Sequence, residues 1–195
     1  MGHPGIKAST VRTWSGLSAA SEEGGTLIEV LISSFILTVA LLAVAATLGA
    51  GVSAMFIAQE ELIAKQKARE GLESVFTARN TQNITFDQIR NASNGGIFLD
   101  GFQPVKTMGN DGIVNTADDG SIETVALAGK DGLLGTTDDE IRSLGIFERK
   151  VTIANLLTQT GSVDSDIRQI TIDVRFQVRS VWRTVSINSY ISRFS

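Results

Sequence analysis

Two stretches of the chain, 20 residues apart, carry acidic residues at the same spacing. In each, an Asp-Gly pair is followed by a threonine and then by two adjacent aspartates. The aspartates are Asp111, Asp118 and Asp119 in the first copy and Asp131, Asp138 and Asp139 in the second. Carboxylates held close by a glycine-bearing loop repel one another, and a hard cation with roughly six to eight oxygen ligands removes that repulsion. The repeat therefore predicts calcium binding, because magnesium demands tighter geometry and keeps its waters.

The repeated loops also have a simpler interpretation. They are not EF-hands, which need acidic groups at alternate positions and a distal glutamate. Asp111-Gly112 and Asp131-Gly132 are typical of tight hairpin turns with solvent-facing aspartates beyond them. Turn chemistry accounts for each Asp-Gly pair but not for the repeated Asp-Asp pair, which favours calcium. One shared site, two sites and one degenerate site are all compatible with the pattern.

A second candidate for chemistry is Glu29, which stands at the start of a long apolar run. No charged residue occurs from Val30 to Phe56, and about 20 residues of helix are enough to span a bilayer. An ionisable group at the edge of such a segment is disfavoured by up to about 3 kcal/mol and is a functional candidate by default. The alternative is a boundary glutamate that reaches the polar headgroups.

The composition excludes several classes of chemistry. The 195 residues include one histidine, His3, and no cysteine, so the usual ligands of zinc, copper, haem and iron–sulfur sites are missing. Ser-His-Asp and Cys-His catalysis need the same side chains, and no pair of carboxylates is spaced for glycosidase-like chemistry. We therefore expect that the protein is not an enzyme. The net charge of −4 gives no reason to expect nucleic-acid binding, which needs a basic face.

The patterns of charge and apolarity predict the elements that position these residues. The apolar run is expected to span a membrane over about residues 27–48, and an amphipathic pattern follows over about 55–80 without a proline. Together they predict one long helix over residues 25–80. Residues 81–145 form an acidic region rich in Gly and Asp, typical of loops. Residues 146–195 alternate with period two, which predicts an antiparallel sheet.

The predicted fold class is α+β, because the amphipathic half of the helix is the available cover for the apolar face of the sheet. The sheet is expected to contain a hairpin over residues 168–194 that turns near Ser180. Within the hairpin, Trp182 and Tyr190 are interpreted as packing or surface aromatics. Four arginines are interpreted as a solvated strand face, or as contacts to acidic neighbours. They are Arg175, Arg179, Arg183 and Arg193.

The junction before the apolar run reads Glu22-Glu23-Gly24-Gly25-Thr26-Leu27-Ile28-Glu29-Val30. It resembles the signature of the prepilin family, which comprises type IV pilins and type II secretion pseudopilins. That signature is a glycine, a cleavage point, an apolar residue, Thr-Leu-Ile-Glu and a long hydrophobic helix. The resemblance implies that residues 1–24 are a leader, that prepilin peptidase cleaves between Gly24 and Gly25, and that Gly25 becomes N-methylated. It also implies that Glu29 pairs with the N-terminal ammonium of a neighbouring subunit.

The order of long helix, variable middle and C-terminal sheet resembles the same family, and its minor subunits more than its major ones. The resemblance implies a pilin-like fold in a single-pass inner-membrane protein that later enters an extracytoplasmic filament. The implied partners are prepilin peptidase, other pilin or pseudopilin subunits and inner-membrane lipid. The spacing of Asp111, Asp118 and Asp119 is similar to that of the calcium loop of the major pseudopilin of type II secretion.

Two other interpretations are weighed against a filament subunit. In the first, the helix is only a tether, and the chain is a membrane-anchored extracytoplasmic module whose calcium loops order a ligand-binding face. In the second, an ordinary secretory signal is cleaved near Ala43-Val44-Ala45 and a free domain is released. The apolar run exceeds the usual signal length of about 7–15 residues and carries Glu29 at its start, which disfavours the second.

Overall fold

The structure, a computed structural model, describes residues 23–157 and 161–194. The chain divides into two compact units, of which the first ends at Val52 and the second begins at Ser53. Helix α1, Glu23–Asn80, contributes residues to both units. Residues 1–22 of the predicted leader lie outside the described residues.

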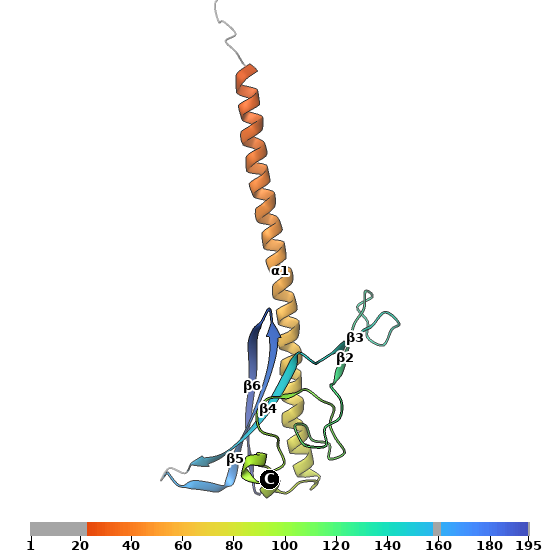
Figure 1. Cartoon of the computed structure of the whole chain (residues 1–195), viewed down its shortest axis with the longest axis vertical. Helices are drawn as coiled ribbons and strands as arrows, with labels where there is room; N and C mark the ends of the chain where they lie inside the picture. The colour runs from red at the N-terminus through yellow and green to blue at the C-terminus, as the bar shows by residue number, and fades with distance from the viewer. Residues whose placement is uncertain (1–22, 158–160, 195) are drawn as a thin grey trace, which may run out of the picture. The chain divides into compact units, whose positions relative to one another are not determined.

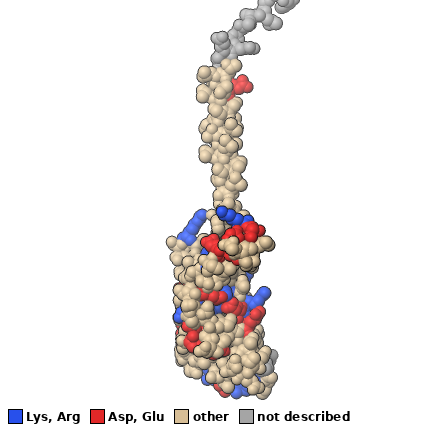
Figure 2. All heavy atoms as spheres, turned by 90° about the vertical axis from the view of Figure 1, so that its right-hand side faces the viewer, with Lys and Arg blue, Asp and Glu red and all other residues tan. Residues whose placement is uncertain are grey.

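The described part of the first unit is the N-terminal stretch of α1. Its side chains are exposed on every side of the helix from Thr26 onward, including those of Leu27, Phe35 and Leu42. Figure 2 shows this stretch as almost entirely uncharged. An apolar surface of this kind is stable only when lipid or other protein covers it. Among the described helices, α1 is the one that is long and apolar enough to cross a membrane, and it is compatible with a single-pass anchor.

The second unit packs the C-terminal half of α1 against a small antiparallel sheet, which confirms the predicted α+β fold (Figure 1). The sheet has four strands in the order β1-β4-β5-β6. Their bounds are Gln103–Pro104 for β1, Phe147–Leu157 for β4, Val163–Val178 for β5 and Val181–Ser192 for β6. The turn of the β5–β6 hairpin consists of Arg179 and Ser180, as predicted, and both residues have positive φ angles.

The core lies between the helix and one face of the sheet. On the helix side, Ala64, Ala68 and Val75 are fully buried, as the amphipathic pattern predicts. On the sheet side, alternate residues of β4 and β5 point inward, and the rings of Phe147 and Phe176 pack 5.6 Å apart. Each fully buried large apolar side chain contributes roughly 1.5–3 kcal/mol. This packing makes the second unit the stable scaffold for the acidic loops.

The segment predicted as loop, residues 81–145, contains more regular structure than its composition suggests. It includes the short helices η1, Phe86–Gln88, and η2, Ala92–Asn94. It also contains strands β2, Thr124–Leu127, and β3, Glu140–Ser143, which pair with each other and enclose the second acidic loop. Four-residue strands are too short to show a clear period of two, so the sequence pattern did not reveal them.

Candidate assembly segment and candidate metal loops

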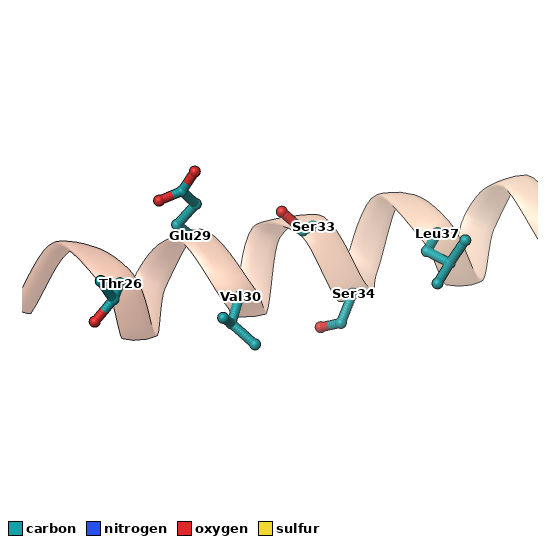
Figure 3. Close-up of a pocket in the computed structure, with 6 residues that line it drawn as sticks. All are labelled: Thr26, Glu29, Val30, Ser33, Ser34 and Leu37. Atoms are coloured by element: carbon teal, nitrogen blue, oxygen red, sulfur yellow. The ribbon is translucent and has the colours of Figure 1, made fainter.

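Glu29 lies on an exposed face of the apolar part of α1. Figure 3 shows its carboxylate projecting away from the helix axis, with Ser33 one turn further along on the same side. A second row of residues four apart, Thr26, Val30 and Ser34, lies beside it. Residues at this spacing share one helix face. The face therefore combines one carboxylate with small polar and apolar side chains, which leaves room for a neighbouring helix to approach closely.

Three hydroxyl groups of this segment donate to carbonyl groups of the helix itself. Ser34 Oγ donates to the Leu31 carbonyl at 2.9 Å, Thr38 Oγ1 to the Ser34 carbonyl at 2.7 Å, and Thr47 Oγ1 to the Val44 carbonyl at 2.8 Å. Such bonds remove the cost of placing a hydroxyl in lipid. Glu29 has no ion-pair partner among the residues that the structure describes. It is therefore the group in this segment that most needs an external partner.

The predicted cleavage point lies at the start of α1. Gly24 and Gly25 both belong to its first turn, four or five positions before Glu29. A helix begins with about four backbone N–H groups that lack partners within the helix. Cleavage between the two glycines would place a charged amine one turn from Glu29.

The first acidic loop closes on its own backbone. Asp111 Oδ1 accepts from the Ile113 amide at 2.8 Å, and Asp118 Oδ2 accepts from the Asp111 amide at 3.2 Å. Asp119 Oδ2 accepts from the Asn115 amide at 2.8 Å. The hydroxyl of Thr116 donates to Asp118 Oδ1 at 2.7 Å. The three aspartates thus satisfy backbone donors that the turn leaves unpaired.

The second acidic loop repeats this geometry almost bond for bond. The Leu133 amide donates to Asp131 Oδ1 at 2.9 Å, the Asp131 amide to Asp138 Oδ2 at 3.3 Å, and the Gly135 amide to Asp139 Oδ2 at 2.6 Å. Thr136 Oγ1 donates to Asp138 Oδ1 at 2.7 Å. The two copies are therefore one structural motif used twice.

The loop geometry also explains why both copies have glycine at the same positions. A Cβ atom on Gly109 would lie 2.3 Å from the Asp118 carboxyl, and one on Gly129 would lie 2.2 Å from the Asp138 carbonyl oxygen. Gly112 and Gly132 have φ angles of 69° and 71°, which glycine adopts without strain. Loop closure thus accounts for every residue type that the copies share, including the Asp-Asp pair that had favoured calcium.

The two copies differ in what surrounds them. In the first loop, Ile113 and Val114 are fully buried in the core, whereas the corresponding Leu133 and Leu134 are 63% and 67% exposed. Asn115 docks the first loop further, because its side-chain amide donates to the Arg149 carbonyl at 3.2 Å. The first loop is thus part of the folded unit, and the second projects from it between β2 and β3.

This contrast predicts different effects of matched substitutions. Ile113→Ala is expected to lower the free energy of unfolding by about 2–5 kcal/mol, because it leaves a cavity in the core. Leu133→Ala, at the equivalent position of the exposed loop, is expected to change it by less than about 0.5 kcal/mol. Denaturant unfolding of both full-length variants in detergent measures the difference. Equal losses would contradict the placement of the two loops.

The carboxylates of the loops are not grouped as a metal site in this structure. Across residues 23–157 and 161–194, no three acidic side chains lie together in a way that could hold a metal ion. The Thr116 hydroxyl lowers the pKa of Asp118, and Thr136 does the same to the pKa of Asp138. Burial instead raises the pKa of Asp119. Calcium binding by these aspartates therefore stays a prediction.

Calcium binding has a direct thermal test. If the loops bind the ion, adding calcium to chelator-treated protein raises the melting temperature, because a ligand that binds only the folded state stabilises it. The double variant Asp138→Asn, Asp139→Asn should show a smaller rise. Adding Asp118→Asn and Asp119→Asn to it should abolish the rise. If calcium does not raise the melting temperature of the unsubstituted protein, the calcium hypothesis is wrong.

The sequence analysis did not predict that several charged residues are buried in the second unit. Glu60 and Lys67 lie on the buried side of α1, where they pair with Arg142 and Glu123, although the amphipathic pattern placed them mostly toward solvent. Arg149 of β4 is fully buried and donates from Nε to Asn115 Oδ1 at 3.2 Å. No local signal marks such residues, since their partners come from distant parts of the chain.

The arginines of the hairpin are mostly paired within the chain. Arg175 bonds Glu148, and its guanidinium lies 4.4 Å from the ring centre of Trp182, which is otherwise 44% exposed. Arg193 pairs with Asp166 at 3.1 Å. Arg179 donates to Ser53 Oγ at 2.7 Å. The alternative contact of these residues with acidic neighbours stays a prediction.

Comparison with known proteins returned no family model, no curated protein and no solved structure that matches this chain.

Proposed function

We propose that the chain is a prepilin-type structural subunit, of the minor kind, of a type IV pilus or type II secretion pseudopilus. Before assembly it is a single-pass inner-membrane protein, and afterwards it belongs to an extracytoplasmic filament. Prepilin peptidase, inner-membrane lipid and other subunits are its partners. The observation that carries the proposal is Glu29, which lies in an exposed apolar helix five residues after Gly24 and has no ion-pair partner within residues 23–157 and 161–194.

The chemistry of processing supports this function. Between Gly25 and Phe56, Glu29 is the only charged side chain, so the segment carries one negative charge before cleavage. Cleavage after Gly24 creates a new ammonium group on Gly25 and supplies the missing positive charge. N-methylation preserves that charge. Processing thus converts a segment with an uncompensated carboxylate into one that is neutral overall.

Assembly then follows from the cost of buried charge. In a filament core built from the apolar helices, an unpaired carboxylate and an unpaired ammonium would each cost several kcal/mol. Pairing Glu29 with the ammonium of a neighbouring subunit removes both costs and fixes how the two helices are aligned. Burial of the apolar surfaces holds neighbouring helices together in no particular alignment, and the ion pair sets the alignment of one helix relative to the next. The second unit, with its acidic loops, decorates the outside of the filament.

The experiment that tests the proposal is mass analysis of the N-terminus of the chain extracted from membranes of its native cell. The proposal predicts a chain that begins at Gly25 and carries one added methyl group. A Gly24→Val variant, which alters only the residue before the cut, should retain residues 1–24 and the larger mass. An intact N-terminus in the unsubstituted protein would refute the proposal and favour the membrane-anchored binding module.

A further inference from the structure

One end of the second unit carries two exposed apolar projections. The β5–β6 turn presents Val181 and Trp182, which are 63% and 44% exposed. The connection between β2 and β3 presents Leu133 and Leu134. Single exposed apolar residues are common on proteins, but two adjacent pairs on two different connections form a distinct feature.

Both projections lie near the N-terminal residues of the second unit. At the β5–β6 turn, Arg179 Nη2 donates to Ser53 Oγ at 2.7 Å. On the other connection, the ends of β2 and β3, Leu127 and Glu140, line a hollow together with Phe56. The β5–β6 turn is thus bonded to residue 53, and the ends of β2 and β3 lie around the same hollow as residue 56. Residues 53–56 are the N-terminal residues of the second unit. Figure 2 shows basic and acidic side chains gathered at this end of the unit.

Ser53 lies close in the chain to the predicted membrane-spanning stretch. Ser53 follows the last residue of the predicted membrane-spanning stretch, Leu48, by five residues. At a rise of about 1.5 Å per residue, those five residues cover about 8 Å of helix. The headgroup layer on each side of a bilayer is about 5–8 Å deep. If residues 27–48 span the hydrocarbon, Ser53 lies at the level of the lipid headgroups.

We propose that this end of the second unit is a membrane-contacting surface in the unassembled subunit, formed by the β5–β6 turn and the second acidic loop. Tryptophan is favoured at the bilayer interface, and arginine bonds phosphate groups. Trp182 with Arg179 and Arg183 provides this combination at the turn. Leu133 and Leu134 provide the apolar contact at the loop. The inference rests on the membrane-spanning helix of the proposed function.

The duplicated motif supports this role for the second loop. Loop closure uses backbone amides and aspartates, and does not require the apolar pair to be exposed. In the first copy the same pair is buried in the core of the unit. Exposing Leu133 and Leu134 is therefore a feature of the second copy alone.

The contact can be measured with tryptophan fluorescence, because the chain has two tryptophans, Trp14 and Trp182. The Trp14→Phe variant, altered only in the predicted leader, leaves Trp182 as the sole reporter in an otherwise native chain. The full-length protein is reconstituted into nanodiscs of phosphatidylcholine and phosphatidylglycerol, with or without bromine atoms on the acyl chains near the headgroup. Bromine quenches tryptophans that reach the bilayer. We expect bromine to reduce Trp182 fluorescence and its emission to be blue-shifted relative to detergent solution.

A second reporter and a matched control complete the test. Adding Trp182→Phe and Leu133→Trp moves the sole tryptophan to the second loop, where we expect quenching as well. Adding Trp182→Phe and Phe194→Trp moves it to an exposed residue near the C-terminus, close to Arg193 and the end of α1, where we expect none. Equal quenching at all three positions, or no quenching at either position 182 or position 133, would overturn the proposal. Nanodisc insertion needs neither cleavage nor assembly, so this result is independent of the test of the proposed function.

Discussion

Replacing Glu29 by leucine is expected to abolish incorporation of the protein into filaments and to leave its membrane insertion intact. If Glu29 pairs as proposed, the substitution leaves a buried ammonium group without its partner, which costs about 3–5 kcal/mol at each subunit contact. It makes the apolar segment more hydrophobic, so insertion is not weakened. Fractionation of cells into membranes and sheared filaments, with detection of the chain in each, measures both effects.

Two controls separate charge from shape at this position. Glu29→Gln keeps the size of the side chain and loses its charge, so it should fail to assemble as Glu29→Leu does. Ser33→Leu places the same leucine one turn along the same helix face and should assemble (Figure 3). Normal assembly of Glu29→Leu would show that the carboxylate is only a boundary residue that reaches the headgroups.

The second large effect is expected at Arg149, inside the second unit. Its guanidinium is fully buried and contacts the first acidic loop through Asn115, and its Nη1 lies 4.0 Å from Glu70 Oε1. Its side chain also lies against Gly71, where an added Cβ would come within 3.4 Å of Arg149 Cδ. Arg149→Ala is expected to lower the free energy of unfolding by about 3–5 kcal/mol, since it leaves a cavity and unpaired polar groups.

Denaturant unfolding of the full chain in detergent measures this loss, and hydrogen exchange locates it. Exchange should accelerate at the amides of residues 111–119, because that loop loses its anchor in the core. Arg149→Met, which restores much of the volume without the charge, should lose less. Arg90→Ala is the surface control, because the Arg90–Asp87 pair is exposed, and it should cost at most about 1 kcal/mol. A loss at Arg149 no larger than at Arg90 would contradict its role as an anchor.

Burial also lowers the pKa of Arg149, while Glu70, Asp119 and Glu123 raise it. Among the described residues, neither of its terminal nitrogens has a hydrogen-bond acceptor. Three acidic groups therefore compensate this charge at longer range. One of these groups, Asp119, belongs to the first acidic loop.

The main elements of the fold could be predicted because their patterns are local. The apolar faces of the helix and strands repeat along the chain with periods that one element imposes, and the hairpin turns where predicted. Buried charges have no such local pattern. Lys67 lies 56 positions before Glu123, and Glu60 lies 82 before Arg142. Their burial depends on how β2 and β3 approach α1, which local periodicity does not encode.

The acidic loops show a different limit of sequence reasoning. The repeat correctly indicated two copies of one motif, and the Asp-Gly pairs correctly indicated turns. The use of the adjacent aspartates as acceptors for backbone amides could not be predicted, because it depends on loop geometry that spacing alone does not define. Calcium binding by the same residues stays a prediction. Nor could the repeat show that Ile113 is buried and Leu133 exposed, since both copies have the same pattern of apolar residues.

The most direct measurement is a cross-link between Glu29 and the N-terminus of another subunit. Filaments are assembled from a mixture of light and isotopically heavy subunits and treated with an apolar carbodiimide, which joins a carboxylate to a nearby amine. We predict a peptide in which the Glu29 carboxylate of this chain in one isotopic form is joined to the N-terminal amine of a neighbouring subunit in the other form. Filaments that contain the chain but give only links within one isotopic form, or none at Glu29, would contradict the pairing on which the proposed assembly depends.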